Sequence, residues 1–258
     1  MARSSFEIER AVVRALFFRE LKTRFGKLRL GYIWAFLEPG AHLMVLVAIL
    51  GYAMHRTMPD ISFPIFLVNG LIPYFLFANI VTRSIGAIEA NKGLFNYRPV
   101  KPVDTVIARS MLETIIYCTV YILLMVAIRL VGEGSVVIRV TEIVLVWLLL
   151  VIFSFGVGLI FMVVGKFSSE AAKVIPILIK PLYFFSCIQF PLNAVPEDYK
   201  PYLLWNPLVH VVELSRKLVV PGYLSEGGNL GYIALCALIS LFTGLALYRL
   251  CEEAMLTS

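Results

Sequence analysis

The stretch RFGKLRLGYIWAFLEPG, residues 24–40, passes within a few positions from a basic segment to an apolar one. Its basic residues end at Arg29, and the only acidic or basic charge in residues 31–53 is Glu38. A cluster of basic residues directly before a long apolar run is typical of a chain that reaches the surface of a bilayer and then crosses it. The stretch therefore predicts a membrane protein whose first span covers residues 31–53.

The composition of the whole chain leads to the same prediction. Of its 258 residues, 60% are hydrophobic and 16% are charged, whereas charged residues make up about 25% of a typical soluble domain. The apolar residues occur in long blocks, which predicts an all-α, polytopic membrane protein with a single domain over residues 1–258. The net charge of +6 would suit a nucleic-acid partner, but eight of the 23 Lys and Arg residues lie within the first 29 positions. That clustering indicates contact with membrane lipids rather than with nucleic acid.

Six apolar blocks predict six transmembrane helices. The predicted spans are residues 31–53, 64–88, 106–128, 143–164, 174–190 and 230–250. Glu38-Pro39-Gly40 predicts a break in the first span or a gradual start to it. Before that span, residues 6–29 predict an amphipathic helix lying in the membrane interface, because Phe17, Leu21 and Phe25 fall on one arc of it.

The number of spans and the basic N-terminal segment together predict the topology. Six spans place both termini on one side of the membrane, and the positive-inside rule makes that side the cytoplasm. Residues 89–105 and 166–173 are then cytoplasmic, and residues 191–229 lie on the opposite side. In this outer segment, Asn206-Pro207 combines a capping residue with a proline, which predicts the start of a short amphipathic helix at or in the membrane surface.

The motifs of common catalytic sites are missing from the sequence. There is no G-x-x-x-x-G-K-[ST] phosphate loop, and no H-E-x-x-H, G-x-S-x-G or C-x-x-C motif occurs. The three histidines lie far apart, and the four cysteines show no paired spacing. Glu113 and Glu142 stand alone near predicted helix ends, which disfavours a proton-coupled transporter. We therefore expect no catalytic residue, no metal site and no nucleotide site in this chain.

The order of these features resembles one family of transport proteins. A basic helix leads into L-G-x-x-W and a proline, six spans follow, and a proline-rich outer segment precedes the last span. This arrangement is similar to the permeases of type-2 ABC exporters over the whole chain. The match of LGYIWAFLEP, residues 30–39, and the short chain most resemble the capsular polysaccharide export permeases of Gram-negative bacteria. The same features separate capsule export from O-antigen or teichoic-acid export only weakly.

That resemblance implies a homodimer of the permease in the bacterial inner membrane, driven by two copies of a separate ATPase that binds ATP and Mg. It also implies that the segment after the second span docks on the ATPase. The implied coupling residues are Lys92, Leu94, Phe95, Asn96, Tyr97, Arg98 and Lys101, with a second contact at Lys166, Ser169, Glu170 and Lys173. The segment suits this role because prolines stiffen it, its aromatic residues can fill a pocket, and its basic residues can meet acidic groups.

The implied substrate is an acidic polysaccharide carried on a lipid, which a periplasmic adaptor and an outer-membrane export protein would receive. Cationic residues would meet the anionic head group, and aromatic residues would stack on the sugars. The candidates for the head group are Arg24, Lys27, Arg29, Arg83 and Lys180, and those for the sugars are Tyr32, Trp34, Tyr74 and Tyr183.

Each of these assignments has a structural alternative. The cations can set the topology, hold lipid phosphate or extend to the interface, and the aromatic side chains can serve as interface anchors or as packing. Gly156 and Gly158 suit close helix packing better than a pore. A different class also stays open, because a membrane enzyme acting on lipid-linked sugars would use acidic residues and a histidine, such as Glu197, Asp198 and His210. A secondary transporter is disfavoured because the sequence shows no internal repeat.

Overall fold

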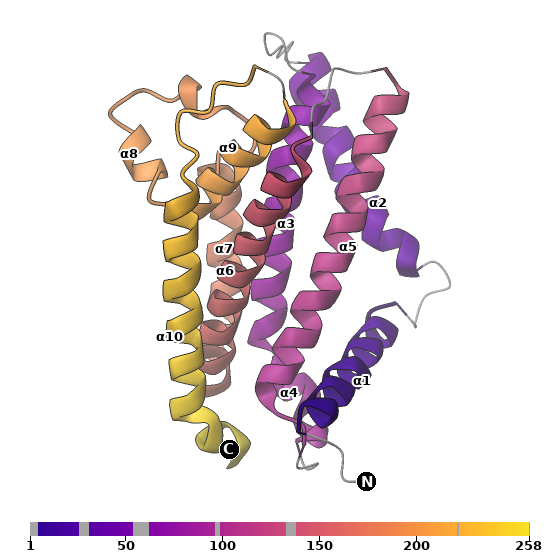
Figure 1. Cartoon of the computed structure of the whole chain (residues 1–258), viewed down its shortest axis with the longest axis vertical. Coiled ribbons are helices and arrows are strands. Elements are labelled where there is room, and N and C mark those ends of the chain that lie inside the picture. Colours follow the sequence, from indigo (N-terminus) through magenta and orange to yellow (C-terminus); the bar gives the residue numbers. More distant parts are fainter. Residues whose placement is uncertain are drawn as a thin grey trace.

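The computed structural model describes residues 5–25, 31–53, 62–95, 99–132, 138–220 and 222–257, whose regular secondary structure is helical throughout. Long helices run side by side between two ends of a bundle (Figure 1). We call one the terminal end, because α1 (Ser5–Phe25) and the last turns of α10 (Leu230–Thr257) lie there. The opposite end, the far end, carries α8 (Lys200–Leu203) and α9 (Pro207–Val219). The predicted all-α class is confirmed.

Five helices in the described part of the chain are long and apolar enough to cross a membrane. They are α2 (Gly31–Leu46) with the π-helical turn Val47–Ala53 that continues it, α3 (Phe63–Ile85), α5 (Pro102–Leu130), α6 (Val140–Phe167) and α10. These helices confirm a polytopic membrane protein. The predicted break at Glu38-Pro39-Gly40 is absent, because α2 continues through Pro39 and the irregular turn follows later. A proline removes only one helical hydrogen bond, which a membrane helix can lose without ending.

The fifth predicted span, residues 174–190, differs from the helix found there. α7 (Ser169–Phe185) begins earlier and ends earlier than that span. The apolar residues after Phe185 form a turn in which Cys187 and Ile188 are fully buried. Hydropathy assigned these residues to the span because it does not distinguish contact with lipid from contact with protein. α7 has 17 residues and two internal prolines, so the count of six spans stays a prediction.

α3 forms the centre of the bundle, where α2, α5, α6, α7 and α9 all contact it. Its sequence is apolar around most of its circumference, which is typical of a helix enclosed by other helices. The side chains of Phe66, Leu71 and Ile72 are fully buried. In a bilayer such burial replaces lipid contacts with protein contacts, so the stabilisation comes from dense packing rather than from the removal of water.

Glycines allow α6 and α10 to pack closely. A Cβ atom on Gly156 would lie 2.5 Å from the backbone nitrogen of Leu241, and one on Gly244 would lie 2.6 Å from the carbonyl oxygen of Gly156. Only a residue without a side chain permits backbones to approach this closely. A Cβ atom on Gly158 would lie 2.7 Å from Ser84 Oγ on α3. The predicted packing role of Gly156 and Gly158 is confirmed.

The helix predicted to start at Asn206-Pro207 is confirmed as α9. The Asn206 side chain accepts a hydrogen bond from the backbone N–H of Leu208 at 3.0 Å, and the proline occupies the first helical position. α9 is buried among α3, α6 and α10. Its Arg216 has no exposed surface, donates to the carbonyl oxygen of Ile188 at 2.8 Å and lies 3.5 Å from the centre of the Phe66 ring. These contacts fasten α9 to α3 and to the buried turn after α7.

The two long predicted links contain helical segments. The link predicted at 89–105 includes the end of α4 (Ala87–Asn91), the 3₁₀ turn Lys92–Leu94 and the first turn of α5. The segment predicted at 191–229 includes the 3₁₀ turn Leu192–Ala194, α8 and α9. α5 starts inside the predicted link because Pro102 suits a first helical position and the backbone N–H of Lys101 donates to Asp104 Oδ2 at 2.9 Å.

Candidate functional site

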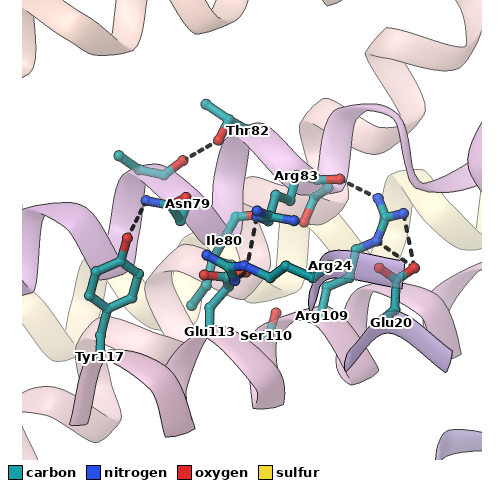
Figure 2. Close-up of polar contacts among 12 residues, drawn as sticks. Glu20, Arg24, Asn79, Ile80, Thr82, Arg83, Arg109, Ser110, Glu113 and Tyr117 are labelled. Atoms are coloured by element: carbon teal, nitrogen blue, oxygen red, sulfur yellow. Dashed lines mark hydrogen bonds and ion pairs between the residues drawn. The ribbon is translucent and has the colours of Figure 1, made fainter. Parts of the chain in front are cut away.

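A buried carboxylate joins three helices (Figure 2). Glu113 of α5 has 1% of its side chain exposed. Its Oε1 atom accepts a hydrogen bond from the guanidinium of Arg24 on α1 and pairs with Arg83 Nε on α3 at 3.0 Å. A buried carboxylate requires such partners, because an unpaired charge in apolar surroundings is strongly unfavourable. The shared oxygen therefore fastens α1 and α3 to the same point of α5.

A second carboxylate continues this arrangement. Glu20 Oε1 accepts a hydrogen bond from Arg109 Nε at 3.0 Å, and Arg109 Nη1 donates to the backbone carbonyl of Arg83. Glu20 and Arg24 are four residues apart on α1, as Arg109 and Glu113 are on α5, so each couple lies on one helix face. Both interhelical pairs join residues 89 positions apart. This register requires α1 and α5 to run alongside each other in the same direction.

We call Glu20, Arg24, Arg83, Arg109 and Glu113 the charge network. The prediction that Glu113 stands alone near a helix end is wrong, because its partners lie on two other helices. The sequence does carry a signal for these contacts. The pattern E-x-x-x-R on α1 is opposite in charge to R-x-x-x-E on α5, so the two patterns are complementary when the helices run in the same direction. The predicted contact of Arg24 and Arg83 with a substrate head group stays a prediction, and both now have an internal partner.

Polar contacts also hold α4 at the terminal end. Arg19 of α1 donates to Asn91 Oδ1, and to the carbonyl oxygen of Ala90 at 3.2 Å. Lys166 Nζ, near the end of α6, pairs with Glu89 Oε1 at 2.8 Å. The hydrogen bond from Lys166 lowers the pKa of the Glu89 carboxyl group. α4 is therefore connected to α1 on one side and to α6 on the other.

The predicted coupling residues follow directly after α4. Lys92 and Lys101 are exposed, whereas Leu94 and Phe95 are half-buried. Phe95 packs against a buried cluster that includes residues of α5, α6 and α10. The remaining predicted coupling residues, Asn96, Tyr97 and Arg98, lie outside the described residues. The described part of this predicted contact thus lies at the terminal end, beside the polar contacts of α4.

The second predicted contact lies where α6 passes into α7. Ser168 alone separates the two helices, and its Oγ accepts a hydrogen bond from the backbone N–H of Ala171 at 3.1 Å. Lys166 pairs with Glu89, which brings this predicted contact beside α4. The other predicted members are exposed at the start of α7: Ser169, Glu170 and Lys173.

An aromatic cluster lies where α2, α3 and α7 meet. The ring centres of Tyr74 and Tyr183 are 5.2 Å apart in an edge-to-face arrangement. The Tyr183 hydroxyl lies 2.9 Å from His42 Nε2, and the Tyr74 hydroxyl donates to the carbonyl oxygen of Ile179 at 3.0 Å. Two of the predicted sugar-stacking residues are therefore neighbours, with a hydrogen-bonding histidine beside them.

The other predicted substrate residues lie apart from this cluster or outside the described part. Trp34 is 57% exposed on α2, and Lys180 is exposed on α7. The Tyr32 side chain, Lys27 and Arg29 lie outside the described residues. These substrate contacts stay predictions. The sequence analysis did not name His42, whose place beside Tyr183 depends on the packing of two helices far apart in the chain.

Two of the residues that a membrane enzyme would use, His210 and Glu197, contact different partners. His210 Nε2 lies 2.8 Å from the carbonyl oxygen of Leu204, and its Nδ1 accepts a hydrogen bond from the backbone N–H of Asn229 at 3.2 Å. Glu197 pairs with Lys200 at 2.7 Å. In the ranges that the structure describes, no group of three His, Cys, Asp or Glu residues could hold a metal ion. The geometry gives no support to the enzyme alternative.

Sequence comparisons relate the chain to known membrane transport proteins. Residues 11–220 match the ABC-2 type transporter family. The polysialic acid transport protein KpsM of Escherichia coli is 66% identical over 258 residues, which cover 100% of both chains. The capsule polysaccharide export inner-membrane protein CtrC of Neisseria meningitidis serogroup A is 29% identical, covering 94% of this chain and 91% of the relative.

A more distant relative has another cargo in its name. The O-antigen export system permease protein RfbA of Klebsiella pneumoniae is 26% identical, covering 89% of this chain and 85% of the relative. The family match spans most of the chain, and the similarity to the KpsM protein spans all of it. The chain therefore belongs to the ABC-2 type transporter family.

Proposed function

We propose that this chain is the transmembrane permease subunit of an exporter that moves a lipid-linked capsular polysaccharide across the bacterial inner membrane. A separate ATPase subunit, present in two copies, powers the movement. The observation that carries this proposal is the 66% identity, over the whole chain, to a polysialic acid transport protein. The O-antigen export permease is 26% identical, less than the polysialic acid transport protein at 66% and the capsule export protein CtrC at 29%. Capsule export is therefore the better-supported cargo class.

Two exposed charges on α2 and α7 support a passage for a hydrophilic polymer between these helices. Glu38 and Lys180 are exposed, and the His42–Tyr183 contact lies on the same two helices. Charged side chains within a membrane rarely face lipid and usually face water or protein. A second copy of the permease, placed against these helices, would enclose a passage lined by these residues. The half-buried Tyr183 would offer its ring to sugars there, and Tyr74, which is buried, would support that ring from behind.

The contacts of α4 support a mechanical role for the segment that follows it. Arg19 joins α4 to α1, Glu89 joins it to α6, and the charge network joins α1 to α3 and α5. A displacement of α4 by a docked ATPase would therefore act on four of the long helices without a nucleotide site in this chain. In this proposal, residues 92–101 bind the ATPase and α1 carries the displacement to the bundle.

The proposal is tested by deleting the gene for this chain in its host and measuring polysaccharide inside the cell and on its surface. Surface polysaccharide should disappear while polymer accumulates inside, and returning the chain should restore export. A Lys217→Gln variant, altered at an exposed position of the far end, serves as a matched control and should export normally. Unchanged surface polymer after removal would contradict export, and normal export with chemically altered polymer would favour an enzyme.

A further inference from the structure

A groove between α1 and α5 combines apolar walls with positive charge. It encloses about 530 Å³, with Met111 and Ile115 of α5 on one wall and phenylalanines of α1 on the other. Arg10 and Arg14 line the same groove, together with one carboxylate, Glu9. Its lining thus carries one net positive charge next to an apolar surface. That combination matches an amphipathic, negatively charged ligand.

A second groove continues the first around α5. It encloses about 460 Å³ between α5, α6 and α10, and it shares Met111 and Ile115 with the first groove. These two side chains, 47% and 53% exposed, form a ridge with an apolar hollow on each side. The polar groups in the second groove are the hydroxyls of Ser110 and Thr114. The charged groups therefore belong to the first groove alone.

The walls of the first groove are held in place by the charge network. Glu20 and Arg24 fasten α1 to Arg109 and Glu113 of α5 (Figure 2). The α1 positions that carry Arg10 and Arg14 lie on the same helix, two to four turns before these pairs. A groove whose walls are fixed in advance binds a ligand with less loss of conformational entropy than a mobile one.

We propose that these two grooves hold one anionic glycerophospholipid of the bilayer. Its phosphate lies at Arg10 and Arg14, and one acyl chain lies on each side of the Met111–Ile115 ridge. Arg10 and Arg14 lie toward the start of α1 at the terminal end, and the apolar second groove lies between the spans. The site is thus charged where the head group would lie and apolar where the acyl chains would lie. An uncharged or zwitterionic lipid would fill the hollows but gain less from the two arginines.

The test measures which lipids stay with the purified full-length chain. The protein is extracted from vesicles of equal parts phosphatidylglycerol and phosphatidylethanolamine, and the retained lipids are counted by native mass spectrometry. The parent chain should retain phosphatidylglycerol preferentially. The Arg10→Gln/Arg14→Gln variant should lose that preference, by about fivefold for each arginine removed. Raising the salt concentration should weaken the preference in the parent.

Two further variants separate this site from general lipid contact. Lys22→Gln/Lys217→Gln changes the net charge by the same amount at exposed positions outside the grooves, and it should keep the parent preference. Met111→Trp enlarges the ridge without changing charge and should reduce the phosphatidylglycerol retained. Equal retention of both lipids by the parent, an unchanged ratio in the arginine variant, or an equal loss in the lysine variant would each overturn the proposal.

Discussion

At the scale of single residues, Glu113 is the buried carboxylate on which the contact between α1, α3 and α5 depends. One of its oxygen atoms serves two arginines from different helices, so the carboxylate is needed by both. Removing one partner of a buried ion pair costs more than the pair contributes, because the remaining charge stays buried. The junction therefore responds more strongly to loss of Glu113 than to loss of either arginine.

Glu113→Gln keeps the shape and one acceptor oxygen but removes the charge. We expect it to lower the free energy of unfolding by about 3–5 kcal/mol, since Arg24 then lacks its counter-ion. Thermal unfolding of the purified protein in detergent measures the loss. Glu142→Gln, at an exposed position, should change it little. Adding Arg24→Gln should restore part of the stability, and a strictly additive double variant would contradict the pairing.

Arg216 on α9 makes a comparable prediction at the far end. Arg216→Met removes the ion pair with Glu213 and leaves that carboxylate buried, so we again expect a loss of about 3–5 kcal/mol. Arg216→Lys should not rescue it fully, because an ammonium group cannot both stack flat on Phe66 and reach the carbonyl of Ile188. Lys217→Met, one residue further and exposed, is the control in the same unfolding measurement. Equal stability of the Arg216→Met and Lys217→Met variants would refute the role of Arg216.

At the scale of elements, local sequence predicted α9 well and the charge network poorly. The start of α9 depends on Asn206 and Pro207, which act on their own helix. The network depends on residues 89 positions apart, and a pass along the chain evaluates each charge only against its neighbours. The end of α7 was misplaced for a related reason, because the residues after Phe185 are apolar but packed against α9. Local chemistry was predictable, and so was the close packing at Gly156 and Gly158, because small residues in an apolar helix indicate it. The contacts between side chains far apart in the sequence were not predicted.

The contact between α6 and α10 yields a test of close packing. Gly156→Ala places a methyl group 2.5 Å from the backbone of α10, so the helices must separate and stability should fall by roughly 1–3 kcal/mol. Gly40→Ala adds the same methyl group to α2 where nothing lies within 4 Å, and it should be neutral or slightly stabilising. Unfolding in detergent compares the two. Equal effects would show that α6 and α10 do not approach as closely as described.

The link between α4 and α5 yields a test of docking. Lys101→Glu reverses an exposed charge within the predicted ATPase contact, and it should reduce the amount of ATPase that copurifies by roughly tenfold. The same reversal at Lys217, at the far end, should leave copurification unchanged. An unfolding measurement on the permease alone should show that the Lys101→Glu variant still folds. Undiminished copurification would argue against residues 92–101 as the docking surface.

At the scale of the whole molecule, two kinds of exposed surface can be distinguished. α10 exposes apolar side chains such as Leu238 and Phe242, which suits lipid. α2 and α7 also expose apolar side chains such as Trp34 and Ile177, but Glu38 and Lys180 lie among them, and lipid would solvate these two charges poorly. In the proposed homodimer, a second copy placed on the α2–α7 side would turn these two charges toward an aqueous passage.

This difference can be measured by labelling single cysteines with a water-soluble maleimide in native membranes. In a chain whose four cysteines are replaced by alanine, Glu38→Cys and Lys180→Cys should react, because a thiol must be hydrated to form the reactive thiolate. Leu238→Cys, 64% exposed on α10 before substitution, should stay unreactive although its position is as open, since lipid surrounds it. Reaction at all three positions would show that the reagent does not distinguish water from lipid. Slow reaction of the Glu38→Cys and Lys180→Cys variants, with normal export, would contradict a polar passage along α2 and α7 and would move it to another face of the bundle.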